Sequence, residues 1–173
     1  TTLRDGLGME GLTLSLEDKL QLVRKLDELG VHYIEGGYPG SSPKEAEFFQ
    51  RARAIALHNA KLVAFGSTRR AGGDAATDPA LRSVLDAETP VITLVGKSSA
   101  TQVRDVLETT EEENLAMIAD SVRLLVGEGR EVIFDAEHFF DGFADDPAYA
   151  LSTLRAAAGA GATTVALCDT NGG

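Results

Sequence analysis

The chain has 173 residues, of which 43% are hydrophobic and 25% are charged, and its formal net charge is −11. This length and composition are typical of one globular domain. The acidic residues are scattered along the chain and no basic patch offsets them, which argues against nucleic acid or an anionic membrane as a partner. No stretch approaches the roughly 20 apolar residues that cross a bilayer.

Cys168 is the only cysteine, so no disulfide can form within the chain. Disulfides are rare in the reducing cytosol, and the first residues lack the charged and apolar regions of a signal peptide. We therefore expect a soluble cytoplasmic protein. Because Cys168 alternates with apolar residues, we expect a buried structural thiol rather than a nucleophile.

Short apolar and β-branched runs predict buried strands along the chain. The first is "TTLRD", at residues 1–5. Five further runs follow, at residues 31–37, 61–67, 90–96, 131–137 and 163–169. Runs that are apolar on both faces are typical of a parallel sheet covered by helices.

Helical patterns alternate with these runs, and each begins at an N-cap. Ser15 opens the first helix with Asp18 in the capping-box position, and Gly30 ends it. Its predicted apolar face consists of Leu22, Val23, Leu26 and Leu29. The other helices are predicted at residues 42–57, 78–88 and 110–129, and after Asp146 and Pro147.

This alternation fits either an open doubly wound sheet or a closed (β/α)₈ barrel. The glycines of "RDGLGMEGLTLS" (4–15) have the G-x-G-x-x-G spacing of a dinucleotide site, but they do not sit directly against a helix N-terminus. In a barrel, polar residues gather at the C-terminal ends of several strands. Polar or small groups end nearly every predicted strand here, namely Arg4 and Asp5, Glu35, 67–69, Lys97 and Ser98, 135–138 and 169–171. The pattern favours the barrel.

A barrel needs eight strands in about 250 residues, whereas six are predicted in this chain. We therefore expect an incomplete TIM barrel, with about six of the eight strands, truncated at both ends. Its outer strands would lack partners for their backbone groups. We expect the isolated chain to be poorly stable or to self-associate.

Six motifs occur in order: "TTLRDG" (1–6), "YIEGGYPGSSPKEAEFF" (33–49), "GKS" (96–98), "TTEEENLAMIADSV" (109–122), "DAEHFFDGF" (135–143) and "LCDTNGG" (167–173). Together they resemble the catalytic barrel of the DRE-TIM metallolyases, the HMGL-like family of isopropylmalate, homocitrate and citramalate synthases and hydroxymethylglutaryl-CoA lyase. "EGGYPGS" and "DAEHFFDG" are most similar to the citramalate synthase branch. The resemblance covers residues 1–173, as part of a pyruvate-carboxyltransferase-type catalytic domain.

The resemblance implies an acyltransferase that performs a Claisen-type condensation. Acetyl-CoA loses a methyl proton, the enolate attacks the keto carbon of pyruvate or another 2-keto acid, and the CoA thioester is hydrolysed. It also implies a place in isoleucine biosynthesis, acetyl-CoA as cosubstrate, a divalent metal (Mg²⁺, Mn²⁺ or Zn²⁺) in the full-length enzyme, and a homodimer. Such chemistry needs a polarising cation, a stabiliser of oxyanion charge and an acid/base group.

By resemblance, five residues of this sequence take roles in that reaction. Asp5 is implied as a metal ligand, and Arg4 as the catalytic group that stabilises the oxyanion, a task that suits a permanently protonated guanidinium. Glu137 is implied as a catalytic glutamate near metal and substrate. Glu35 belongs to the substrate-binding region, where it orients the arginine, and Thr170 contacts the keto acid's carboxylate.

Structural interpretations remain open beside these roles. Arg4 and Asp5 could form a surface ion pair, and Glu35 could pair with Arg4 simply as structure. Lys97 could bind an anion or form an ion pair at its strand end. We expect His138 to be a packed or supporting residue rather than a metal ligand. Two further histidines are expected to face solvent, His32 and His58.

Three features depart from the family's pattern. The family takes two further metal ligands from an H-x-H pair on strand 7, which residues 1–173 lack, so we expect this chain alone not to hold the metal tightly. Gly8 stands where the family usually has a glutamine. "SSATQ" (98–102) replaces a stretch that contains tryptophan and histidine, which leaves substrate choice open.

Three functions therefore compete. The first is citramalate synthase activity of the parent protein, with this chain inactive by itself. The second is another activity of the family, that of isopropylmalate or homocitrate synthase or of the lyase. The third is a non-catalytic partial barrel, which Gly8 and the missing histidines favour.

Overall fold

A computed structural model describes residues 1–172. Five parallel strands form one sheet in the sequential order β1-β2-β3-β4-β5. The strands are β1 (Tyr33–Gly37), β2 (Lys61–Ser67), β3 (Val91–Lys97), β4 (Glu131–Glu137) and β5 (Thr164–Leu167). They match the five predicted runs from 31–37 onward. Because a doubly wound sheet reverses its strand order at a switch point, the sequential order confirms the barrel-type arrangement.

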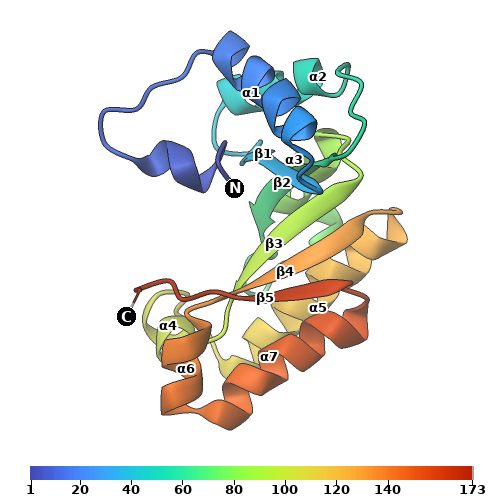
Figure 1. The fold of residues 1–173 in the computed structure, drawn as a ribbon. Helices are drawn as coiled ribbons and strands as arrows, with labels where there is room; N and C mark the ends of the chain where they lie inside the picture. The colour runs from blue at the N-terminus through green and yellow to red at the C-terminus, as the bar shows by residue number, and fades with distance from the viewer. Residues whose placement is uncertain (173) are drawn as a thin grey trace.

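Seven α-helices precede or connect the strands within the described residues (Figure 1). They are α1 (Leu16–Leu29), α2 (Pro43–Ala52), α3 (Pro79–Asp86), α4 (Ala100–Asp105), α5 (Glu111–Gly127), α6 (Phe139–Asp145) and α7 (Pro147–Ala160). Two 3₁₀ turns accompany them, η1 (Asp5–Gly8) and η2 (Ala75–Thr77). The second predicted helix ends earlier than expected, and α4 and α6 were not predicted. None of the described helices is long and apolar enough to cross a membrane.

The predicted helix starts are confirmed by their capping hydrogen bonds. Ser15 and Asp18 form a reciprocal capping box at α1, and Gly30 ends the helix in the left-handed conformation. The apolar face predicted for α1 is wrong at one position, because Leu29 lies in the last turn with 76% of its surface exposed. The other four predicted helices begin after the caps Ser42, Asp78, Thr110 and Asp146.

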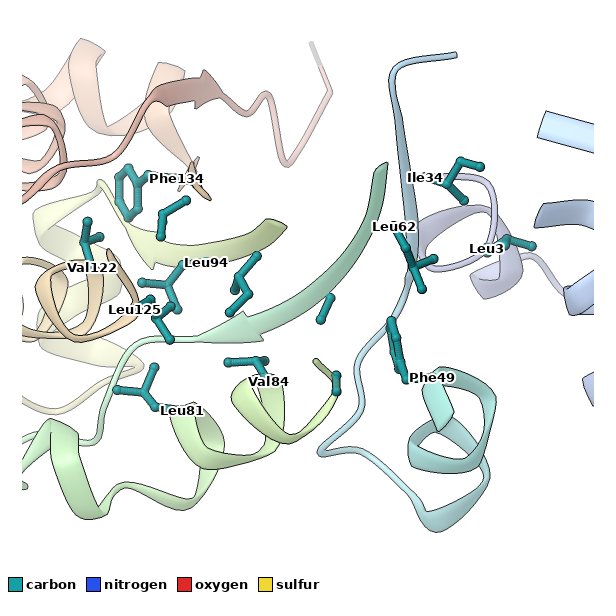
Figure 2. Close-up of a cluster of buried hydrophobic side chains, with 14 of the residues drawn as sticks. Leu3, Ile34, Phe49, Leu62, Leu81, Val84, Leu94, Val122, Leu125 and Phe134 are labelled. Carbon is teal, nitrogen blue, oxygen red and sulfur yellow. The ribbon is translucent and has the colours of Figure 1, made fainter. Parts of the chain in front are cut away.

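The strand predicted at residues 1–5 is not formed, so the sheet has five strands where six were expected. The amides of Arg4 and Gly6 both donate to the carbonyl of Thr1, which closes a turn that leads into η1. These local bonds satisfy the backbone without a neighbouring strand. Leu3 is nevertheless buried in the hydrophobic core and fixes the segment against it (Figure 2).

The two faces of the sheet have different surroundings. Along β4, the side chains of Val132, Phe134 and Ala136 are fully buried, whereas the alternate residues from Glu131 to Glu137 are partly exposed. The buried face packs against α5 and α7, which lie side by side (Figure 1). Burial of each large apolar side chain there stabilises the fold by about 1.5–3 kcal/mol. Asp135 and Glu137, near the end of β4, therefore sit on the opposite, more open face.

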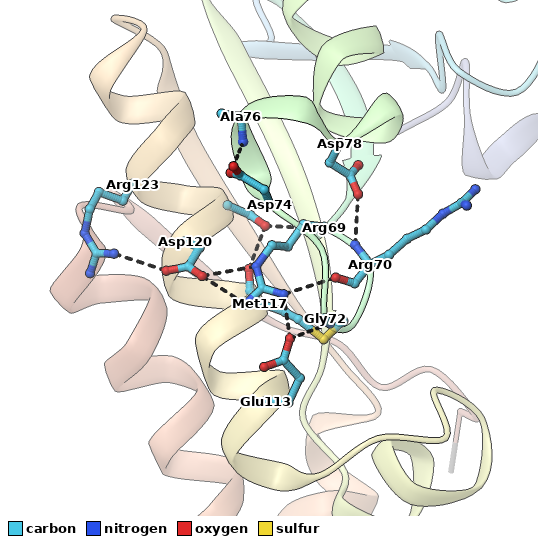
Figure 3. A network of polar contacts seen from close by, with 11 residues as sticks. Arg69, Arg70, Gly72, Asp74, Ala76, Asp78, Glu113, Met117, Asp120 and Arg123 are labelled. Atoms are coloured by element: carbon cyan, nitrogen blue, oxygen red, sulfur yellow. Dashed lines mark hydrogen bonds and ion pairs between the residues drawn. The ribbon is translucent and has the colours of Figure 1, made fainter.

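The loop after β2 is fixed by a buried arginine (Figure 3). The Arg69 side chain is 5% exposed and its guanidinium binds Glu113 at 2.6 Å and Asp120 at 2.9 Å, both on α5. Its backbone amide donates to the Ser121 hydroxyl. The amide of Arg70 donates to the carboxylate of Asp78, the N-cap of α3. Although Arg69 follows a strand end, its side chain serves the packing of this loop on α5.

Candidate active site

A cavity of about 270 Å³ lies at the C-terminal ends of the strands. It is lined by Arg4, Asp5, Phe65, Val95, Asp135, Glu137, Cys168, Asp169 and Thr170. These residues come from the N-terminal turn, from β2, β3 and β4, and from the segment after β5. Pockets for drug-sized ligands measure roughly 300–1,000 Å³, so this cavity has the size for a smaller molecule.

Arg4 is held in place from two sides. Its Nε donates to Glu35 Oε1 on β1, and its guanidinium carbon lies 3.8 Å from the centre of the Phe65 ring on β2. The Thr1 hydroxyl donates to the same glutamate oxygen at 2.8 Å. Cation–π stacking and a charge-assisted hydrogen bond fix both the plane and the direction of the guanidinium. Because the hydrogen bond to Glu35 comes from Nε, the two terminal nitrogens of Arg4, Nη1 and Nη2, are not committed to that carboxylate.

Asp5 begins the η1 turn beside Arg4. Its side chain is 75% exposed, and its carboxylate lies 3.9 Å from Arg4 Nη1. Within residues 1–172, no three histidine, cysteine, aspartate or glutamate side chains are grouped closely enough to hold a metal ion. Asp5 as a metal ligand therefore stays a prediction.

Glu137 ends β4 at the cavity wall and forms an ion pair with the neighbouring strand. Its Oε2 lies 2.6 Å from Lys97 Nζ at the end of β3, and the two residues are partners in the parallel register. The ion pair was one of the two alternatives for Lys97. Lys97 does not line the cavity itself, whereas Glu137 does.

Two further groups on the cavity wall have raised pKa values. Burial, together with the negative charge of Glu35, raises the pKa of Asp135 to about 6, although the nearby Arg4 opposes the shift. Burial, and then the charges of Asp135 and Glu137, raise the pKa of Cys168 to about 11. The thiol is therefore neutral at pH 7, as expected of a group that is not a nucleophile. The expectation of a buried Cys168 is met only in part, because the residue is half-buried on the cavity wall.

Thr170 and His138 meet where the chain leaves β4 and β5. The amide of His138 donates to the Thr170 hydroxyl at 2.8 Å. His138 has a φ of 56° and begins α6 from this left-handed conformation. Its side chain lines a neighbouring pocket with Asp141 and Asp145 rather than the main cavity. His32 and His58 are exposed, as expected.

The structure thus brings the five predicted site residues together. Arg4, Asp5, Glu137 and Thr170 line one cavity, and Glu35 supports Arg4 from its side. Five lining residues were not among the predicted site residues, namely Phe65, Val95, Asp135, Cys168 and Asp169. Asp135 lies two residues before Glu137, and since side chains alternate along a strand, this spacing places both carboxylates on the same face.

Comparisons with known proteins agree with this architecture. The family model described as HMGL-like matches residues 1–173. The chain belongs to the HMGL-like family. The (R)-citramalate synthases of Aquifex aeolicus and Streptomyces coelicolor are 56% and 55% identical to this HMGL-like chain, over all of its length. A probable 2-isopropylmalate synthase of Methanopyrus kandleri is 34% identical over 99% of the chain.

The match spans part of each relative. The chain covers 33% of the length of each of the two citramalate synthases. Among solved structures, the HMG-CoA lyase of Bacillus subtilis aligns with 99% of this chain at a TM-score of 0.74 and 18% identity, and 57% of the lyase is covered. At that identity the likeness shows the fold, and it confirms that the HMGL-like chain has the architecture of a partial TIM barrel.

Proposed function

We propose that residues 1–173 are part of the catalytic barrel of a citramalate synthase-like acyltransferase, which condenses acetyl-CoA with pyruvate in isoleucine biosynthesis. The observation that carries the proposal is the 46–56% identity to five (R)-citramalate synthases over the full chain. Identity to the isopropylmalate and homocitrate synthases is 32–34%. The cavity of about 270 Å³ supports a small keto acid as the acceptor.

Arg4 is the proposed stabiliser of developing oxyanion charge. Its guanidinium is already oriented by Glu35 and Phe65 before substrate binds. A donor that needs no reorientation is worth more to a transition state than a mobile one. Thr170, which lines the same cavity from the segment after β5, is the proposed contact for the acceptor's carboxylate.

Glu137 is the proposed acid/base group of the chain. In the proposed reaction, a methyl proton leaves acetyl-CoA and the resulting carbanion forms a carbon–carbon bond with the keto carbon. The keto oxygen gains a proton, and water then cleaves the thioester to release the CoA thiol. A carboxylate at the cavity wall can take or return a proton at hydrogen-bond distance.

Asp5 is the proposed contribution of this chain to the binding of a divalent metal, which would polarise the acceptor in the full-length enzyme. The remaining ligands are proposed to lie outside residues 1–173, because the described residues hold no group of three ligands. A homodimer and a cytoplasmic location belong to the same proposal.

The site is tested by comparing two glutamates of β4. Glu137→Gln and Glu131→Gln make the same change at the two ends of one strand face. In the full-length protein, CoA release from acetyl-CoA with pyruvate should fall by at least about 100-fold in Glu137→Gln and stay within about threefold of the unmodified protein in Glu131→Gln. Equal activity of the two variants would contradict the proposed role of Glu137. An inactive but folded unmodified protein would favour a non-catalytic barrel.

A further inference from the structure

The ion pair between Lys97 and Glu137 lies at the rim of the proposed site. The side chains are 17% and 30% exposed, and Nζ lies 2.6 Å from Oε2. Within residues 1–172, no other side chain forms an ion pair with the Glu137 carboxylate. One carboxylate oxygen is thus committed to Lys97, which leaves Oε1 for a ligand in the cavity.

The backbone at Lys97 is supported from behind by a buried polar pair. Asn114 on α5 is fully buried, and its Nδ2 donates to the Lys97 carbonyl at 2.9 Å and to the Tyr149 hydroxyl at 2.8 Å. Burial raises the pKa of Tyr149 to about 12, so its hydroxyl stays neutral. The amide of Ser98 donates to the Glu137 carbonyl at 2.9 Å and joins the two strand ends.

Charges in the cavity make such an anchor necessary. Asp5, Asp135, Glu137 and Asp169 all line it, and Arg4 is the one lining residue of opposite charge. Arg4 is directed toward Glu35 and lies 3.9 Å from Asp5, so Glu137 does not share its closest contacts. Like charges within a few ångströms repel strongly where water is partly excluded. Lys97 supplies the ion pair that opposes this repulsion at Glu137.

We propose that Lys97 is a positioning residue, which holds the Glu137 carboxylate in one orientation at the cavity and is itself held by Asn114. The proposal rests on the proposed function of Glu137. Lys97 acts through Glu137 and does not touch the reacting atoms. Groups that orient a catalytic side chain are typically worth 10–100-fold in activity.

The chain offers a control at the other end of β4. Lys61 on β2 forms an ion pair with Glu131 on β4 at 2.8 Å. Lys97→Met and Lys61→Met each remove a lysine from an ion pair with a β4 glutamate, and only Glu137 lines the cavity. Lys97→Arg keeps the positive charge at the site.

In the full-length protein, we expect Lys97→Met to lower kcat about 10- to 100-fold with a change of less than about threefold in the KM of pyruvate. Lys97→Arg should recover part of the loss, and Lys61→Met should leave kcat within about twofold. In a Glu137→Gln background, Lys97→Met should change kcat by less than about twofold, because the group that it positions is absent. Independent, multiplicative effects of the two changes would overturn the proposal.

Crystal structures of the unmodified protein and Lys97→Met provide a readout that does not depend on activity. We expect the Glu137 carboxylate to leave the cavity wall, or to lose its single orientation, in Lys97→Met alone. An unchanged Glu137 would overturn the positioning role even if the protein has no synthase activity. Absence of CoA release from the unmodified protein, with Glu137 displaced as expected, would refute the proposed function and leave the positioning role intact.

Discussion

Asp135→Asn should stabilise the protein at neutral pH and leave its stability unchanged in acid. Burial and the neighbouring glutamates raise the pKa of Asp135 from 3.8 to about 6. Each pKa unit corresponds to 1.36 kcal/mol, so the full shift is about 3 kcal/mol. Because part of the side chain remains exposed to solvent, screening reduces the effect, and we expect about 1–1.5 kcal/mol.

The sign follows from proton binding in the two states. Between about pH 4 and pH 6 the folded protein holds a proton on Asp135 that the unfolded chain has lost, so the free energy of unfolding falls as pH rises through this range. Asparagine resembles the protonated side chain and does not titrate. Asp135→Asn should therefore match the unmodified protein near pH 4 and exceed its stability by about 1–1.5 kcal/mol at pH 7.5.

Urea unfolding of the full-length protein at both pH values, in metal-free buffer, measures this difference. Glu131→Gln is the control of opposite sign, since hydrogen bonds from Lys61 and Tyr33 lower the pKa of Glu131. That variant should be less stable than the unmodified protein at pH 7.5, and the difference should shrink in acid. An Asp135→Asn variant that is no more stable at pH 7.5 would refute the account of the cavity's electrostatics.

Three further predictions concern single residues. Lys19→Met should lower the free energy of unfolding by about 2–3 kcal/mol, because it leaves Glu45 without its buried partner at 2.9 Å. Lys25→Met breaks an exposed ion pair and should lower it by less than about 0.5 kcal/mol. Equal losses in urea unfolding would contradict the burial argument. Gly8→Gln should change the free energy of unfolding by less than about 0.5 kcal/mol, since a Cβ at Gly8 meets nothing within 4 Å; a clearly lowered melting temperature would show that the position requires glycine. Arg4→Lys should lower kcat about 100-fold or more, because an ammonium cannot reproduce the planar fork of donors, and a kcat within threefold would exclude the proposed oxyanion role.

Local signals made much of the fold predictable from the sequence. Ser15, Asp18 and Gly30 fix the ends of α1 by bonds within a few residues, so their pattern can be interpreted without tertiary structure. The five strands from β1 to β5 are similarly marked by continuous apolar runs. Glu137 and Thr170 lie together because parallel strands bring their carboxyl ends to one edge, whereas Arg4 and Asp5 reach the same cavity from a turn.

Features that depend on distant neighbours were harder to predict. Whether residues 1–5 extend as a strand depends on a partner on the outer side of β1, and the amides of Arg4 and Gly6 bond locally instead. The α6 helix is short, and its Gly142 lies directly against the Ser98 carbonyl, a contact between segments far apart in the chain. Cys168 lies on the cavity face because of its register with β4, which an apolar pattern around it does not specify.

CoA release by the full-length protein, followed with a thiol reagent, tests the central claim most directly. The assay compares pyruvate with longer 2-keto acids at equal acetyl-CoA, with Mg²⁺ or Mn²⁺ and with the ions chelated. The account predicts that CoA release depends on the metal and is fastest with pyruvate. It also predicts no release by residues 1–173 alone. Faster release with a longer keto acid, or thioester cleavage without any keto acid, would contradict it and assign the barrel to another reaction of the family.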